Sequence, residues 1–151
     1  QIITDKLGID ISNLPGSGAA GGLGGGLVAF TGAILKPGID IVIDNCKVRD
    51  ELKDAVLVIT GEGKTDSQTS YGKVPVGIAS VANNFNVPVV CLSGGLQEGY
   101  EEIYKHGIDA AFSNVTDAMP LSEAISKSGD MLTKAAYSIG RLILRFYKDL
   151  F

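Results

Sequence analysis

The sequence predicts an α/β fold built on a parallel β-sheet. Three short apolar runs have the character of buried strands, at residues 56–60, 87–92 and 109–112. The branched, uniformly apolar run that begins at Val56 suits a strand covered on both faces. Helical patterns separate the three runs, and this alternation implies right-handed crossovers between parallel strands. Three strands are few for such a sheet, so either the glycine-rich segment near the N-terminus adds one or others lie outside this sequence.

Composition supports a folded chain and excludes several functions. The 151 residues are 45% hydrophobic and 20% charged, which is typical of one compact domain or of part of a larger protein. The net charge is −4 and no Lys/Arg cluster is interleaved with aromatic residues, so nucleic acid is not an expected partner. No apolar run approaches 18 residues and no basic-then-apolar leader is present, so we expect no membrane span and a cytoplasmic location. The chain begins with Gln1 and not Met, which favours a fragment.

The cysteines and the single histidine do not suggest a metal site. Cys46 and Cys91 lie 45 positions apart in apolar surroundings, so we expect reduced core residues. Together with His106 they cannot supply the four ligands of a structural zinc site. His106 stands next to Gly107 at the end of a short predicted helix and is interpreted as a surface residue.

The N-terminal third is rich in glycine. Residues 1–14 show no clear period, and seven of the eleven residues in 16–26 are glycine. Apolar positions then recur at helical spacing, which predicts a helix over residues 19–35 that Pro37 and Gly38 end. Residues 39–46 fit a strand or a helix, and residues 49–55 fit a short polar helix or a turn.

The rest of the chain is mostly helical outside the three strands. A helix is expected over residues 74–85, with Pro75 in its first turn, where a missing N–H does no harm. A short helix covers residues 100–105. Residues 121–148 carry apolar side chains on a 3.6-residue period, which predicts a long amphipathic helix that could break near Gly129.

The loop that follows the first strand carries the residue types that phosphate chemistry needs. Ligands of α/β sheets bind where strands end, and this loop holds Glu62, Asp66 and Lys73 between glycines. Phosphoryl transfer requires neutralised charge, a metal held by carboxylates and a positioned acceptor hydroxyl. The alternative to a phosphate site is that this loop is a surface turn whose charged side chains are simply solvated.

Two short motifs match known patterns less well. Residues 63–65 (G-K-T) resemble the end of a phosphate-binding P-loop, but Val58 stands where its first glycine is needed. Residues 16–21 match G-x-G-x-x-G, yet residues 9–15 make a poor strand before it, which weakens the case for a dinucleotide site. These glycines could instead pack tightly against a neighbouring helix or form an anion site at a helix N-terminus, and the sequence leaves both possibilities open.

Three stretches together resemble the bacterial type-1 glycerate kinases. They are L-P-G-S-G-A-A-G-G-L-G at residues 14–24, V-I-T-G-E-G-K-T-D-S-Q-T-S-Y-G-K-V-P-V-G-I-A at residues 58–79, and S-G-G at residues 93–95. The resemblance covers essentially the whole chain, with the motifs in the family's order. It implies an ATP-dependent kinase that uses Mg²⁺ and phosphorylates D-glycerate to a phosphoglycerate.

The resemblance also implies a particular domain organisation. Residues 1–47 would be the tail of an inserted second α/β domain, and residues 48–151 the returning half of a Rossmann-like lobe. This chain would then be a C-terminal portion that requires the N-terminal remainder of the same protein, with the isolated fragment inactive. The resemblance leaves the oligomeric state open.

For the positions that match the family's motifs, we infer the role of each side chain from its chemistry. As hypotheses, Asp66 orients or deprotonates the glycerate hydroxyl, Lys73 contacts phosphate and Glu62 binds Mg²⁺. The remaining candidates would bind substrate or phosphate: Gly16, Ser17, Gly18, Gly61, Gly63, Gln68, Thr69, Ser93 and Gly94. A general base could also lie in the N-terminal remainder. The alternatives are a non-catalytic module that binds a nucleotide or small acid and, third, a dinucleotide-dependent oxidoreductase.

Overall fold

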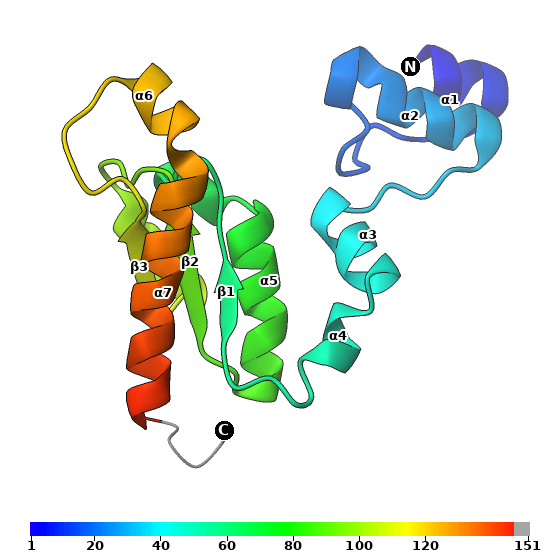
Figure 1. Ribbon diagram of the computed structural model, residues 1–151. Coiled ribbons are helices and arrows are strands. Elements are labelled where there is room, and N and C mark those ends of the chain that lie inside the picture. The colour runs from blue at the N-terminus through cyan, green and yellow to red at the C-terminus, as the bar shows by residue number, and fades with distance from the viewer. Residues whose placement is uncertain (147–151) are drawn as a thin grey trace. The chain divides into compact units, whose positions relative to one another are not determined.

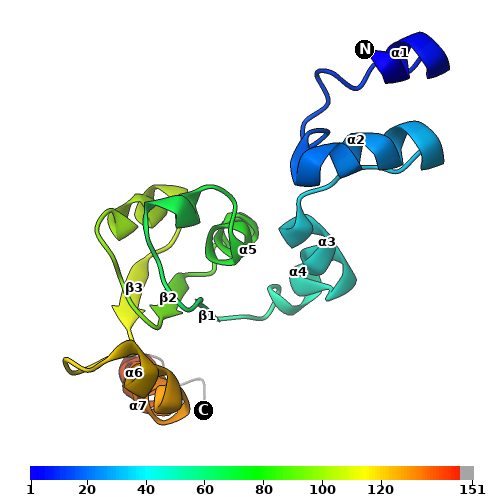
Figure 2. The same cartoon turned by 90° about the horizontal axis from the view of Figure 1, so that it is seen from above.

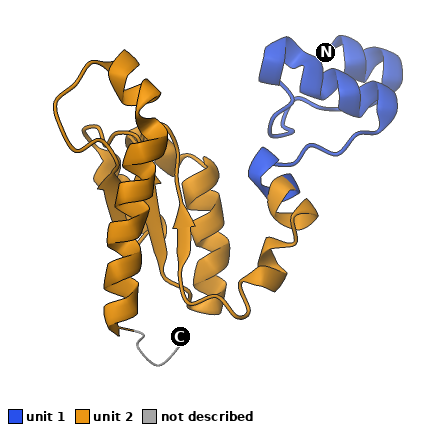
Figure 3. Ribbon diagram, viewed as in Figure 1, with its two compact units in different colours: residues 1–41 blue, residues 42–151 orange. Residues whose placement is uncertain are grey.

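The computed structural model describes residues 1–146 and divides the chain into two compact units, residues 1–41 and 42–151 (Figure 3). The second unit contains the β-sheet and the first contains only helices and turns. The expected boundary between an inserted domain and a Rossmann-like lobe, after residue 47, stays a prediction.

The second unit is built on a three-stranded parallel sheet (Figure 1). Its strands are β1 (Val58–Thr60), β2 (Val89–Ser93) and β3 (Ala110–Ser113), and they lie in the order β1-β2-β3. This confirms the predicted mixed α/β class and the parallel pairing. Within residues 1–146 the glycine-rich segment forms a helix and adds no strand, so that alternative is wrong.

Helices cover both faces of this sheet (Figure 2). On one side lies α5 (Val74–Ala82), which Pro75 helps to start as predicted. On the other lies α7 (Ser128–Phe146), whose Ile139 packs with Val90 and Leu92 of β2. All five residues of β2 are buried, as expected for a central parallel strand covered on both faces.

The edge strand β1 departs from the sequence-based expectation. Ile59 is 48% exposed, so the prediction of a strand covered on both faces is wrong at this position. The reason is position in the sheet: β1 is an outer strand of the described three, whereas the apolar cluster beneath α7 is centred on β2.

Shorter helices complete the second unit. The 3₁₀ helices are η1 (Ser67–Ser70), η2 (Asn83–Phe85) and η3 (Tyr100–His106), and the remaining α-helices are α4 (Val48–Glu51) and α6 (Leu121–Ser126). The long C-terminal helix is interrupted as expected, although at Lys127 and not at Gly129. The last residues predicted for it, 147 and 148, lie outside the described part of the chain.

In the first unit, α1 (Ile2–Leu7) was not predicted, because its residues show no amphipathic period. The glycine-rich helix α2 (Ala19–Thr31) ends four residues earlier than expected, at a left-handed Gly32. It is kinked near its start, where Ala20 to Gly22 have positive φ. The ambiguous stretch after it is a helix, α3 (Gly38–Asn45), which crosses the boundary between the units.

Two of the three cysteine and histidine predictions hold. Cys91 is buried and His106 is exposed, as expected, but Cys46 is exposed, so its assignment to the core is wrong. It follows α3 directly, and the buried residue of that helix is Ile43. Within the described residues, no cluster of three or more His, Cys, Asp or Glu side chains could hold a metal. None of the described helices is both long and apolar enough to cross a membrane.

Candidate functional site

The loops after β1 and β2 are joined to each other at the carboxyl edge of the sheet. The Thr65 N–H donates to the Gly95 carbonyl at 2.9 Å, and the Gln97 N–H donates to the Thr65 carbonyl at 2.9 Å. The Gly94 N–H donates to the Glu62 carbonyl at 3.1 Å. These bonds extend the parallel pairing of β1 and β2 beyond the strands, so the candidate loop has a defined backbone.

Two glycines make this pairing possible. A Cβ atom on Gly61 would overlap the carbonyl oxygen of Leu92, and one on Gly94 would overlap the carbonyl oxygen of Gly63. Both obstacles are backbone, which cannot rotate aside. Gly61 and Gly94 therefore have a structural reason to be glycine, while Gly63 has open space around it. Their predicted contact with phosphate or substrate stays a prediction.

A buried hydroxyl network holds the side chain of Glu62. Thr65 Oγ1 donates to Glu62 Oε1 at 3.0 Å, and Thr69 Oγ1 donates to the same oxygen at 2.6 Å. Thr65 Oγ1 lies 2.5 Å from Ser93 Oγ; because the single Thr65 proton goes to Glu62, Ser93 must be the donor. Cys91 Sγ borders the network, 3.5 Å from Ser93 Oγ. One carboxylate oxygen is thus fixed by two hydroxyls.

Two predicted substrate-binding residues belong to this network. Thr69 is fully buried, and its hydroxyl both donates to Glu62 and accepts from the Asp66 N–H at 3.3 Å. Ser93 is 1% exposed and its hydroxyl is engaged with Thr65. These side chains help to position Glu62 and the loop. Direct contact of Thr69 and Ser93 with substrate stays a prediction.

Asp66 stands between two lysines. Its Oδ2 lies 3.2 Å from Lys64 Nζ and its Oδ1 lies 3.6 Å from Lys73 Nζ, with the Asp66 side chain 17% exposed. The hydrogen bond from Lys64, helped by the Gln68 N–H and the charge of Lys73, lowers the pKa of Asp66. Asp66 is therefore a carboxylate with two cations beside it.

The same side chain also caps a helix. Asp66 accepts from the Gln68 N–H at 3.0 Å and forms a capping box with Thr69 at the start of η1. Lys73, whose Nζ lies 3.6 Å from Asp66, is also the N-cap residue of α5, and a helix N-terminus carries positive potential. Gln68 itself is exposed on η1. The arrangement gathers a carboxylate, two ammonium groups and a helix N-terminus.

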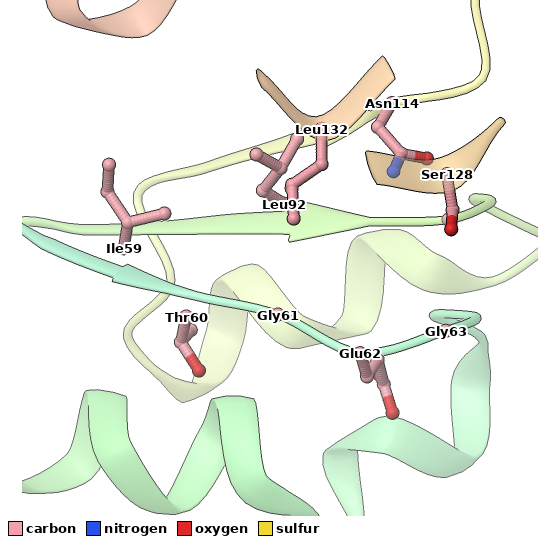
Figure 4. Close-up of a pocket in the computed structure, with 10 residues that line it drawn as sticks. Ile59, Thr60, Gly61, Glu62, Gly63, Leu92, Asn114, Ser128 and Leu132 are labelled. Atoms are coloured by element: carbon pink, nitrogen blue, oxygen red, sulfur yellow. The ribbon is translucent and has the colours of Figure 1, made fainter. Parts of the chain in front are cut away.

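A cavity of about 420 Å³ opens on the other side of the β1 loop (Figure 4). Leu92, Leu132 and Ile59 give it an apolar wall. Figure 4 shows the Glu62 side chain pointing to the opposite side of the strand from Leu132 and Asn114. The β1 loop thus separates the carboxylate network from an apolar space beneath α7.

An adjoining cavity of about 470 Å³ lies under α6. The two cavities share Gly63, Gly94, Asn114 and Ser128. Asn114 is 7% exposed, and its Oδ1 accepts no hydrogen bond within the described residues. Neither Asn114 nor Lys64 was among the site residues predicted from the sequence; the available signal for Asn114 is a polar residue at the end of a third parallel strand.

The structure brings most of the predicted residues together. Those in the second unit converge at the carboxyl edge of the sheet: Gly61, Glu62, Gly63, Asp66, Gln68, Thr69, Lys73, Ser93 and Gly94. Gly16, Ser17 and Gly18 belong to the first unit, so their sharing of one site with the loop stays a prediction. Within the first unit, Gly24 and Gly25 let α2 pack against the turn that contains Gly16 and Ser17, so close packing is the favoured role of those two glycines.

Comparison with known proteins gives consistent matches. A family model described as the glycerate kinase family matches residues 1–144. A glycerate kinase of Halalkalibacterium halodurans is 48% identical over 139 residues, which cover 92% of this chain and 37% of that protein. A glycerate 2-kinase of Escherichia coli is 42% identical over 139 residues, which cover 92% of this chain and 36% of that protein.

A solved structure agrees with these matches. The crystal structure of a protein named glycerate kinase 2 from Salmonella typhimurium LT2 superimposes with a TM-score of 0.76 at 38% identity. The match covers 97% of this chain and 37% of that one. The chain spans little more than a third of the length of the relatives it matches.

Proposed function

This chain belongs to the glycerate kinase family, and from that premise we propose that it is part of an enzyme that transfers a phosphoryl group from ATP to D-glycerate. The observation that carries the proposal is Asp66 held between Lys64 and Lys73 at the carboxyl edge of the sheet. Phosphoryl transfer depends mainly on alignment and on neutralising charge, and this cluster offers groups for both.

The two lysines would receive phosphate. Lys64 and Lys73 expose 53% and 40% of their side chains, so each can turn from Asp66 to an incoming anion. The N-terminus of α5, beside Lys73, adds backbone N–H groups that favour negative charge. Charge that develops on the transferred group would then be stabilised by a preorganised site.

Asp66 would orient the acceptor hydroxyl. Because its pKa is lowered, chiefly by the hydrogen bond from Lys64, it is a weak base while both lysines face it. A carboxylate can still accept a hydrogen bond from the glycerate hydroxyl and align it with phosphorus. Phosphate that draws the lysines away would raise the pKa of Asp66 and make it a better proton acceptor.

Mg²⁺ is the metal that we propose for this reaction, supplied with ATP. Proteins usually hold it with one or two carboxylates and leave the other positions to water and phosphate oxygens. Glu62 fits this pattern, since within the described residues hydroxyls engage only its Oε1. When bound, the ion would neutralise phosphate charge. No group of three or more acidic, His or Cys ligands exists among residues 1–146, so Glu62 would act with phosphate.

The competing functions differ in how well the structure accommodates them. A dinucleotide site at residues 16–21 requires a strand just before them, but residues 8–15 form no strand and α1 precedes them. A non-catalytic module that binds a nucleotide or small acid is compatible with the same loops. The cytoplasmic location, and the need for the N-terminal remainder before turnover occurs, stay predictions.

The test uses the full-length protein that contains this chain, with ATP, Mg²⁺ and D-glycerate. We expect phosphoglycerate to form, and Asp66→Asn to lower kcat about 100-fold or more through lost alignment. Asp50→Asn, which changes an exposed carboxylate paired with Lys53, is the matched control and should leave kcat unchanged. The amount of phosphoglycerate, measured by mass spectrometry, shows whether the protein phosphorylates D-glycerate. Nucleotide binding without any product would favour the non-catalytic module, and an unchanged kcat would remove Asp66 from the chemistry.

A further inference from the structure

The cavity under α6 contains a polar group that nothing in the described part of the chain satisfies. Asn114 is 93% buried, and its Oδ1 has no donor within the described residues. The residue is held in place because its backbone N–H donates to the Ser93 carbonyl at 2.8 Å, directly after β3. A buried acceptor without a donor is costly, and in native proteins such groups usually have a specific reason.

The walls around Asn114 are mostly apolar, with Lys64, Gln97 and Ser128 as their other polar members. Leu96 and Val115 come from the loops after β2 and β3, and α6 contributes Leu121, Ala124 and Ile125. Leu121 and Ile125 expose 75% and 65% of their surface, so a flat ligand in the cavity would cover them. A volume of about 470 Å³ and an apolar lining with one buried amide are typical of a small-molecule site.

One side of the cavity reaches the charged cluster. Lys64 lines the cavity and also lies 3.2 Å from Asp66. A ligand with an apolar ring beside Asn114 could therefore place an anionic group at Lys64. D-glycerate is a poor fit to the apolar part, because a small hydroxy acid has no surface to cover Leu121 and Ile125.

We infer that this cavity binds the base of the nucleotide, with the Asn114 side-chain oxygen accepting from the exocyclic amino group of adenine. The inference rests on the proposed function in taking ATP to be the ligand. It assigns the base to α6 and the ends of β2 and β3, and directs the phosphates toward Lys64. It also makes Asn114 the residue that distinguishes adenine from a base with a carbonyl at that position.

The test compares ATP with inosine triphosphate, in which a carbonyl replaces the amino group. Calorimetric titration of the full-length protein measures binding of each nucleotide, and steady-state kinetics measure the KM of D-glycerate. We expect ATP to bind about 10-fold or more tightly than inosine triphosphate, because the carbonyl of the wrong base would face Asn114 Oδ1 and could not donate to it. Asn114→Ala should weaken ATP binding to about the level of inosine triphosphate and leave the KM of glycerate unchanged.

Two further variants complete the design. Ala124→Phe narrows the apolar part and should weaken both nucleotides alike, which supplies a test even if Asn114→Ala fails to fold. Asn84→Ala is the matched control, since Asn84 is exposed and its side chain donates to the Ser80 carbonyl, away from the cavity. It should change neither nucleotide affinity nor selectivity.

The outcomes separate this inference from the proposed function. Nucleotide binding that depends on Asn114 and Ala124 in a protein that never phosphorylates glycerate would support the cavity and reject the kinase. Glycerate phosphorylation with ATP selectivity unaffected by Asn114→Ala would support the kinase and overturn the inference. A rise in the KM of glycerate with Asn114→Ala, at constant ATP affinity, would also overturn it.

Discussion

The chain contains two glycine-containing stretches that differ in composition and in what surrounds them. In the β1 loop, residues 61–73, Gly61 lets two backbones pair while hydroxyls and lysines converge on two carboxylates. In residues 16–26, Gly24 and Gly25 let α2 approach its own preceding turn, and the helix contains no charged side chain. Glycine content alone therefore does not identify a ligand site; the polar partners beside the glycines do.

The largest effect that would test this comparison is expected at Gly61. Gly61→Ala places a Cβ on the Leu92 carbonyl in the central strand, so we expect a loss of about 3 kcal/mol of stability or more. Thermal unfolding of the full-length protein measures this loss of stability. Gly63→Ala, in the same loop but with open space around the residue, is the control and should change stability by less than about 0.5 kcal/mol. Equal effects at the two positions would contradict the loop pairing.

A second prediction concerns the hydroxyl network that the other glycine-rich stretch lacks. Thr69→Val keeps the shape of the side chain but removes a donor to Glu62 and the acceptor of the Asp66 N–H, so we expect a loss of about 2 kcal/mol. Thr69→Ser should restore most of it. Thr133→Val, which removes an exposed hydroxyl on α7, is the control. Urea unfolding of the full-length protein monitors all three, and a harmless Thr69→Val would show that the network does not stabilise the loop.

Much of the second unit could be predicted because its signals are local. Uniform apolar runs specify β2 and its neighbours, and Pro75 marks the start of α5. The convergence of Glu62, Asp66 and Lys73 followed from a general rule about strand ends. Burial of individual side chains could not be predicted in the same way, because the exposure of Ile59 depends on which strand lies at the edge.

Other features of the site were not visible in the sequence. The hydroxyls of Thr69 and Ser93 face Glu62 and Thr65, which the sequence did not indicate because only packing decides whether a hydroxyl faces a ligand or the interior; their contact with substrate stays a prediction. Asn114 was missed because an unsatisfied buried amide is a property of its surroundings. The helix α1 has no sequence period to reveal it. Long-range packing, which a local pattern does not contain, determines the hydroxyl contacts and the burial of Asn114, whereas α1 buries no residue and rests on local hydrogen bonds.

The smallest expected effect lies in the glycine-rich helix itself, where neighbouring positions should respond in opposite directions. Gly24→Ala would bring a Cβ to 2.6 Å from the Gly16 carbonyl oxygen, so we expect a loss of about 1 to 2 kcal/mol. Gly26 has open space around it in the same helix, so Gly26→Ala should stabilise by about 0.5 to 1 kcal/mol through helix propensity. Amide hydrogen exchange of α2 in the full-length protein measures both changes in stability.

The direction in which each variant changes the stability of α2 is the informative result. If the glycines of α2 serve packing against the preceding turn, protection should fall with Gly24→Ala and rise with Gly26→Ala, while the affinity for ATP stays constant in both variants. A loss of ATP affinity in the well-protected Gly26→Ala variant would instead indicate that a ligand approaches this helix closely. That result would make the two glycine-rich stretches alike in function and would remove the distinction drawn between them.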